Sequence, residues 1–327
     1  VGDEVHRLGL KFLVWFEPER VMPHTWLREN HPEWLLAPSD LPDEVAYQKD
    51  WRLLDLGNPQ ALAWAKKTFS GMIGEAGIDI YRHDFNLHPL WYWRAGEAPD
   101  RQGMNEIRYI TGLYDYFDTL QREHPNLLID NCASGGRRLD FEMMRRSVPL
   151  WRTDLCWEPV AEQSMTYALS LWLPLHGVGA VSLNPYDFRS GMGSNFSLAV
   201  DFYSQDPTFW EQVTRLLKQY LSVRQLYRGD FYPLTDYTVS DEGWIAFQFD
   251  RPDLGEGLVQ AFRRASCPED SARLMLCGLE PEATYTVSNL DGGEPQQVTG
   301  RYLTENGLPV SLPARPSATV IVYERRT

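Results

Sequence analysis

Short apolar runs that end in polar side chains alternate with helical segments over residues 1–231. The clearest run is residues 78–86, which opens with Ile-Asp-Ile and closes with Arg, His, Asp and Asn. Such a run, short and rich in β-branched residues, predicts a buried strand. Strands that alternate with helices form parallel sheets. This part of the chain is therefore expected to hold a parallel sheet flanked by helices.

The polar clusters decide between two parallel-sheet folds. Expected strands lie at residues 10–16, 51–56, 78–84, 127–130, 148–154, 177–183 and 196–202, and expected helices at 1–8, 59–75, 104–123, 162–172 and 207–228. Polar residues gather at the ends of at least five strands, as in a barrel whose site draws on all its strands. A doubly wound open sheet would concentrate them at one switch point. We therefore predict a (β/α)8 TIM barrel that lacks its first strand.

The pattern changes after residue 231 to short strands separated by Asp-Gly, Pro and Gly turns. Strands are expected at residues 244–249, 257–262, 272–276, 284–287 and 318–323. Such spacing predicts an antiparallel β-sandwich. The chain is thus divided into a barrel, residues 1–231, and a β-sandwich, residues 232–327, whose expected role is to pack on the barrel and stabilise it.

Charge and termini narrow the class of protein. The net charge of −14 argues against a nucleic-acid partner. No apolar run is long enough for a membrane span and no signal peptide opens the chain, so we expect a cytoplasmic protein without a membrane partner.

The first residue, Val1, lies within an expected helix, so we expect the sequence to be a piece of a longer polypeptide. Cys267 and Cys277 could pair in a secreted protein, whereas reduced thiols fit the cytoplasm.

Two carboxylates, Asp84 and Asp154, end strands that lie two apart in the predicted barrel. Paired carboxylates across a pocket are what glycoside hydrolysis requires, one ionised and one protonated. Arg82 would favour ionised Asp84, and the apolar neighbours of Asp154 would favour its protonated form, although Arg152 opposes this. The same mouth could hold a metal, but it offers few acids and no His at ligand spacing, so no metal or other cofactor is expected.

Four motifs stand in order along the barrel: Phe-Leu-Val-Trp-Phe-Glu-Pro-Glu at residues 12–19, Tyr-Arg-His-Asp-Phe-Asn at 81–86, Asn-Cys-Ala-Ser-Gly-Gly-Arg-Arg at 131–138 and Trp-Arg-Thr-Asp at 151–154. This set resembles the family 36 glycoside hydrolases, the large microbial α-galactosidases. The resemblance implies an exo-acting, retaining hydrolase of terminal α-galactosyl residues, without metal or cofactor. Asp84 would be the nucleophile and Asp154 the acid/base.

The resemblance also implies which residues bind the carbohydrate. The Cys-Ala-Ser-Gly-Gly motif lines the galactose pocket in that family, which assigns Cys132, Ser134 and Gly135 here. The family's usual Lys-Trp before the nucleophile is Arg82-His83 in this chain, and Arg82 can still donate to a sugar hydroxyl. In that family the first barrel strand carries an Asp-Asp pair that binds galactose. The sequence of this chain is expected to lack that strand.

Further pocket residues are less closely defined by the sequence. Asn86 would hydrogen-bond the sugar 2-hydroxyl or serve the loop, and Trp15 and Trp151 would line the pocket. Glu17 and Glu19 would either line it or pair with Arg20 or Arg52. Other aromatic and polar side chains are candidate platforms or rim residues with packing as the alternative: Trp91, Trp93, Asn184, Tyr186 and Arg189.

Two other functions stay open. One is a related α-glycosidase, acting on α-N-acetylgalactosaminides or as a transglycosylase. The other is a non-catalytic carbohydrate-binding relic, which the missing strand would permit. Homo-oligomerisation is expected only by analogy with the family.

Overall fold

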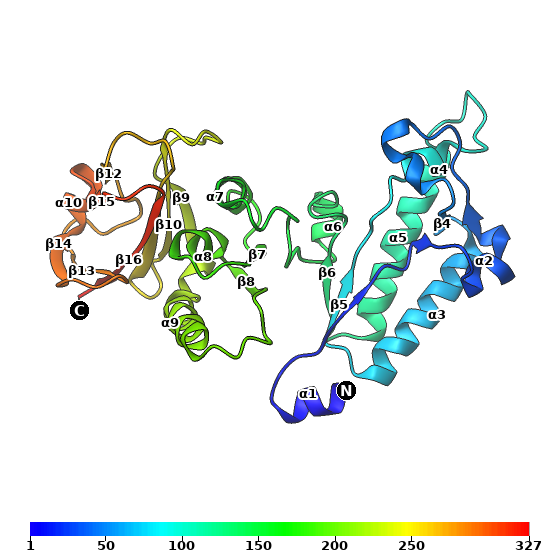
Figure 1. The fold of residues 1–327 in the computed structure, drawn as a ribbon, viewed down its shortest axis with the longest axis horizontal. Helices are drawn as coiled ribbons and strands as arrows, with labels where there is room; N and C mark the ends of the chain where they lie inside the picture. Colours follow the sequence, from blue (N-terminus) through cyan, green and yellow to red (C-terminus); the bar gives the residue numbers. More distant parts are fainter. Residues whose placement is uncertain (327) are drawn as a thin grey trace. The chain divides into compact units, whose positions relative to one another are not determined.

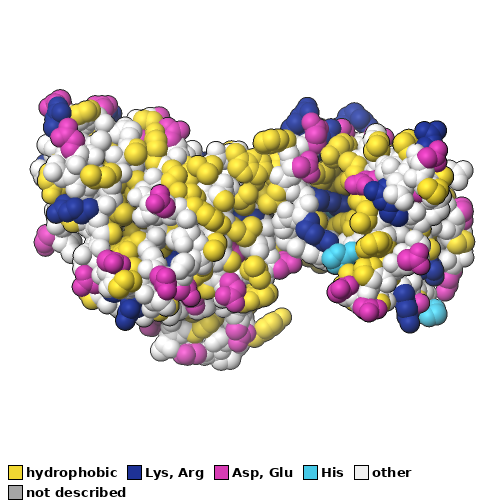
Figure 2. Space-filling model, turned by 90° about the horizontal axis from the view of Figure 1, so that it is seen from above, with side chains coloured by type: hydrophobic (Ala, Val, Ile, Leu, Met, Phe, Trp, Pro, Cys, Tyr) yellow, Lys and Arg dark blue, Asp and Glu magenta, His cyan; other side chains and the backbone are white. Residues whose placement is uncertain are grey.

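The computed structural model describes residues 1–326 and divides into two compact units, Val1–Pro149 and a second that begins at Leu150 (Figure 1). On the face shown in Figure 2, acidic and basic side chains are interspersed with apolar ones. No helix within residues 1–326 is both long and apolar enough to cross a bilayer.

The first unit is built on a parallel sheet of order β1-β5-β6, formed by Leu13–Phe16, Ile80–His83 and Leu128–Asn131. Val148 adds a parallel bridge to Asp130. Helices α3 (Pro59–Ala76) and α5 (Met104–Glu123) lie along this sheet (Figure 1).

Side chains of the sheet alternate between two faces. Phe16 and His83 are register partners and face the helices, where Phe16 packs on Phe69 of α3 and His83 on Phe117 of α5. Trp15 and Arg82, also register partners, therefore face the opposite side. Asp84 continues the parity of Arg82, so the strand presents it on the face away from the helices.

Local signals set the bounds of α3. Asn58 caps its first turn by accepting the N–H groups of Gln60 (2.9 Å) and Ala61 (3.4 Å), and Pro59 occupies the first helical position. Gly77 ends the helix with φ 65°, a conformation that favours glycine.

We expect Asn58→Ala to lower the free energy of unfolding by about 1 kcal/mol, because two N–H groups lose their acceptor. Urea denaturation followed by circular dichroism would measure it. Asn58→Asp, which keeps the acceptor, is the matched control and should stay near the parent value. Equal losses in both variants would contradict the capping role.

The prediction of a barrel strand at residues 51–56 is wrong. β4 (Arg52–Leu54) lies antiparallel between β2 (Arg20–Val21) and β3 (Leu35–Leu36), so β1 pairs directly with β5. Leu53 and Leu54 are both fully buried. A short buried run of this kind does not reveal from its sequence alone which strands it pairs with. The remaining elements of the first unit are α1 (Gly2–Arg7), α2 (Trp26–Asn30), η1 (Pro32–Trp34), η2 (Asp43–Gln48), α4 (Leu90–Arg94) and α6 (Phe141–Met144).

The second unit opens with a smaller parallel pair, β7 (Gly177–Ala180) and β8 (Asn195–Leu198). The backbone N–H of Arg152 donates to Gly177 (2.7 Å), which places the segment before Asp154 beside β7. Three helices accompany this pair: α7 (Pro159–Ser170), α8 (Pro185–Gly191) and α9 (Pro207–Val223), the last followed by η3 (Leu226–Arg228). Within residues 1–326 the parallel strands thus form two partial sheets, and the predicted barrel is covered only in part.

The predicted antiparallel sheet near the C-terminus is confirmed. Its order is β14-β13-β16-β11-β10-β9, formed by Gln296–Thr299, Thr284–Asn289, Ser317–Arg325, Glu256–Arg263, Trp244–Arg251 and Asp230–Pro233. A two-stranded sheet of β12 (Ser271–Leu274) and β15 (Leu308–Ser311) and helix α10 (Gly300–Glu305) complete this region.

The six-stranded sheet is covered on both faces. Phe247 and Phe262 belong to a core with α8 and α9, whereas Ala246 and Val259 belong to a second core with β12, β15 and α10. β10 and β11 are therefore buried along nearly their whole length.

Candidate active site

Asp84 lies directly after β5, and its backbone N–H donates to Phe16 (2.8 Å). Its carboxylate accepts hydrogen bonds from Trp15 Nε1 (3.0 Å), the N–H of Phe85 (2.7 Å) and the N–H of Ser134 (3.4 Å). The side chain is only 8% exposed, and burial opposes ionisation. Hydrogen bonds from Asn86, Trp15 and Phe85 outweigh this and lower the pKa of Asp84. Asp84 is therefore an ionised, fixed carboxylate at neutral pH.

The loop after β6 brings a backbone donor to Asp84. Ser134 and Gly135 adopt positive φ values of 47° and 82°. Two consecutive left-handed residues turn the chain sharply, and this turn directs the N–H of Ser134 toward Asp84. The Ser134 hydroxyl donates to Asn86 Oδ1 (2.8 Å), which ties this loop to the segment after β5.

Arg137 also stabilises the loop after β6. Its Nε donates to the carbonyl of Ala133 (2.9 Å), and its Nη2 to the carbonyl of Phe85 and the hydroxyl of Ser134 (2.9 Å each). Sequence reasoning did not single out Arg137, although two consecutive arginines after the glycines were visible in the sequence.

We expect Gly135→Ala to lower stability by about 1 kcal/mol, because alanine resists the left-handed conformation. Gly136→Ala is the control, since Gly136 has no positive φ. Thermal denaturation of both variants would measure the effect, and equal melting temperatures would contradict it.

Arg82 shares a face with Asp84 but forms an ion pair with Asp130, its register partner on β6 (2.6 Å). The leading influences on the ionisation of Asp84 are burial and the hydrogen bonds described above, rather than Arg82. Cys132 is buried, and burial raises the pKa of its thiol to about 12, so the thiol is neutral and can donate to Asp84.

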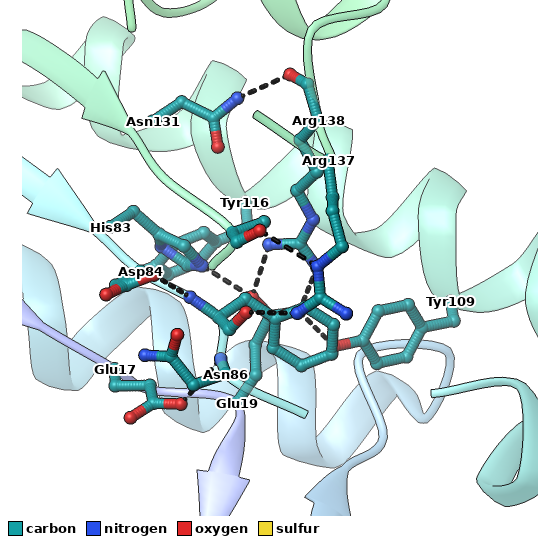
Figure 3. Close-up of polar contacts among 12 residues, drawn as sticks. Glu17, Glu19, His83, Asp84, Asn86, Tyr109, Tyr116, Asn131, Arg137 and Arg138 are labelled. Atoms are coloured by element: carbon teal, nitrogen blue, oxygen red, sulfur yellow. Dashed lines mark hydrogen bonds and ion pairs between the residues drawn. The ribbon is translucent and has the colours of Figure 1, made fainter. Parts of the chain in front are cut away.

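Glu17 and Glu19 have different partners. Glu17 forms an ion pair with Arg20 and accepts the N–H of Asn86 (2.7 Å). Burial raises the pKa of Glu17. Glu19 pairs with Arg138 (2.7 Å) rather than with Arg20 or Arg52 (Figure 3). The sequence did not indicate this pair, because its members stand 119 positions apart.

Asp154 belongs to the second unit and is exposed there, with Trp151 Nε1 donating to its Oδ1 (3.2 Å). Leu155 and Trp157 are 46% and 61% exposed, so within this unit they do not supply the predicted apolar enclosure. Residues 149–154 form no strand, contrary to the prediction for residues 148–154, and all three side chains are exposed. Arg152 is turned away into the core, where it pairs with Glu162 (2.8 Å).

Several candidate platform and rim residues have structural roles. Trp93 is buried against Tyr109 (ring centroids 5.4 Å apart), whereas Trp91 is half-buried on α4. Asn184 caps α8 by accepting the N–H of Tyr186 (2.8 Å). Arg189 is buried and binds the carbonyl of Ala318 (2.7 Å), which joins α8 to β16. Cys267 and Cys277 are both free thiols, and no group of acids, His and Cys suited to a metal occurs in the described part of the chain.

Residues 1–194 match the family description Melibiase. The α-galactosidase AgaA of Geobacillus stearothermophilus is 28% identical over 97% of this chain and 44% of its own length, and α-galactosidase 1 of Pediococcus pentosaceus is 28% identical over 91% and 42%. The chain thus spans less than half the length of these curated relatives.

Solved structures agree with the sequence matches. An α-galactosidase from Lactobacillus brevis superposes with a TM-score of 0.86 at 23% identity, covering 100% of this chain and 46% of that one. A variant of AgaA from Geobacillus stearothermophilus in complex with raffinose gives 0.84 at 25% identity, covering 99% and 46%. With the family match over more than half of its residues, the chain belongs to the Melibiase family, glycoside hydrolase family 36, as its four motifs predicted.

Proposed function

We propose that this chain carries the catalytic carboxylates of a retaining α-galactosidase that releases terminal α-galactosyl residues from galacto-oligosaccharides. The observation that carries the proposal is the Asp84 carboxylate, which accepts hydrogen bonds from Trp15, Phe85 and Ser134 among others and has a lowered pKa. A nucleophile needs this combination, because it must be ionised and aimed before the substrate arrives. The relatives are named α-galactosidases, and structures of AgaA variants contain raffinose or stachyose.

The proposed reaction has two displacements. In the first, Asp84 attacks C1 of the galactosyl group while Asp154 gives its proton to the departing oxygen. In the second, Asp154 takes a proton from water, and the resulting oxygen nucleophile breaks the galactosyl ester and frees Asp84. Both steps invert C1, so the product keeps the α configuration. Neither step draws on a metal or redox cofactor.

The side chains near each carboxylate take proposed binding roles. Asn86 and Cys132 both donate to Asp84, and their proposed role is to contact the sugar hydroxyls nearest the anomeric carbon. Further pocket roles are proposed for Arg82, Ser134 and Gly135 around Asp84, for Trp15 on the same face, and for Trp151 beside Asp154.

Product analysis tests the proposal. The purified protein should hydrolyse 4-nitrophenyl α-galactoside and raffinose, and proton NMR should detect α-galactose before mutarotation. A panel of aryl glycosides, including the α-N-acetylgalactosaminide, separates the related glycosidases. Initial release of β-galactose would contradict the retaining mechanism. Galactose binding without any product would favour a carbohydrate-binding protein.

A further inference from the structure

A buried polar cluster of Glu19, His83, Tyr109 and Arg138 adjoins Asp84 through His83, the residue before it (Figure 3). Glu19 is 0% exposed and is the centre of the cluster. Its Oε1 accepts from Arg138 Nη1 (2.7 Å) and His83 Nε2 (2.6 Å), and its Oε2 accepts from Arg138 Nη2 (2.7 Å) and the Tyr109 hydroxyl. Both carboxylate oxygens are therefore fully used inside the protein, and neither is free for a substrate.

The cluster joins the three segments that surround Asp84. Glu19 lies on the chain after β1, His83 is the last residue of β5, and Arg138 follows the loop after β6. His83 is covalently next to Asp84. Arg138 also stacks over the ring of Phe85 (4.2 Å), and its carbonyl accepts from Asn131 Nδ2 (2.8 Å).

The ionisation states of His83, Glu19 and Arg138 strengthen the hydrogen bonds and the ion pair of this cluster. Burial lowers the pKa of His83, so the ring is neutral, with Nε2–H donating to Glu19 and Nδ1 accepting from the Tyr81 hydroxyl (3.2 Å). Burial alone would raise the pKa of Glu19, but Arg138 outweighs it and holds that pKa well below its usual range. One negative and one positive charge thus cancel within the cluster.

We infer that Glu19 is a positioning residue for Asp84. By holding His83 and Arg138 together, it fixes the end of β5 and the loop after β6 at the spacing that keeps the N–H groups of Phe85 and Ser134 on the Asp84 carboxylate. Only the description of Asp84 as a nucleophile rests on the proposed function; the placement of its carboxylate does not.

The test is a charge-neutral double variant, Glu19→Gln with Arg138→Met. It removes the bidentate pair and its two opposite charges together, while glutamine keeps an acceptor for His83 and methionine fills the volume of the arginine stem. Buried ion pairs replaced in this way commonly leave proteins folded. The other titratable groups near Asp84 stay unchanged: Glu17, Arg82, His83, Cys132 and Arg137.

Two readouts are taken on the double variant. Carbon-13 NMR of the Asp84 carboxyl carbon, assigned with Asp84→Asn, measures its pKa without any substrate. We expect the pKa to rise by about half a unit as the donors loosen. With 4-nitrophenyl α-galactoside, kcat should fall about ten- to a hundredfold while KM changes little, because misplacing a nucleophile costs rate more than binding.

Asp250→Asn is the matched control. Asp250 is a buried carboxylate of β10 that accepts from the Tyr323 hydroxyl (2.6 Å), and its replacement should lower stability while the Asp84 pKa stays constant. An unchanged Asp84 pKa and kcat in the double variant, with only stability reduced, would overturn the positioning role. A parent protein without turnover whose Asp84 pKa still rises in the double variant would refute the proposed function and support the positioning role.

Discussion

Asp84→Ala should reduce turnover of 4-nitrophenyl α-galactoside by about 10⁴-fold or more, because it removes the proposed nucleophile that forms the galactosyl ester. The loss should appear in kcat, and added azide should restore part of the rate. Azide occupies the space of the missing carboxylate and attacks C1 once, so the rescued product should be the β-galactosyl azide. Rate measurements with and without azide, followed by NMR of the product, check this result.

Asp55→Ala is the control for this experiment. Asp55 also follows a short buried strand, but its carboxylate accepts the N–H of Gly57 (2.9 Å) in a turn before α3. Its replacement should change stability rather than kcat. Full activity in Asp84→Ala, or a rescued product of α configuration, would remove Asp84 from the role of nucleophile.

Arg152→Met should lower the free energy of unfolding of the second unit by about 3–5 kcal/mol. Arg152 and Glu162 are each 1% exposed and form an ion pair (2.8 Å), with further bonds from Arg152 to His176 (2.7 Å) and Thr166 (2.8 Å). Removing the guanidinium leaves the Glu162 carboxylate buried without its cation. Chemical denaturation followed by tryptophan fluorescence measures the loss.

The pH dependence of this loss has a definite sign. Burial already raises the pKa of Glu162, and without Arg152 that pKa should rise further. A carboxyl group whose folded pKa exceeds its unfolded pKa stabilises the fold at low pH and loses that contribution as pH rises through the folded pKa. The deficit of Arg152→Met should therefore be smaller near about pH 5 than near about pH 7.5.

A double variant provides the control for the ion pair. Arg152→Met with Glu162→Leu removes both charges and should recover most of the lost stability, since no uncompensated charge stays buried. If the double variant is as unstable as Arg152→Met, packing of the arginine rather than charge pairing accounts for the effect.

The sequence by itself determined the elements that depend on local patterns. The apolar stripe of residues 104–123 predicted α5 with the bounds Met104–Glu123 that the structure has. Asn58-Pro59 and Gly77 marked the two ends of α3 within one residue. The strand that presents Asp84 was also visible, because β-branched residues followed by a polar cluster are recognisable over a few positions.

Only the tertiary structure decided which strands pair with one another and which charged side chains form ion pairs. The short runs at residues 13–16 and 52–54 look alike in the sequence, yet β1 pairs parallel with β5 and β4 pairs antiparallel with β2 and β3. Arg82 could have paired with Asp84, two residues along the chain, but strand register placed Asp130 beside it. Glu19 pairs with Arg138 rather than with Arg20, because the fold brings the segment after β1 beside the end of the loop after β6. Helix periodicity and caps act over a few residues, whereas pairing depends on which distant segments the fold brings together, and many charged residues could satisfy each ion pair.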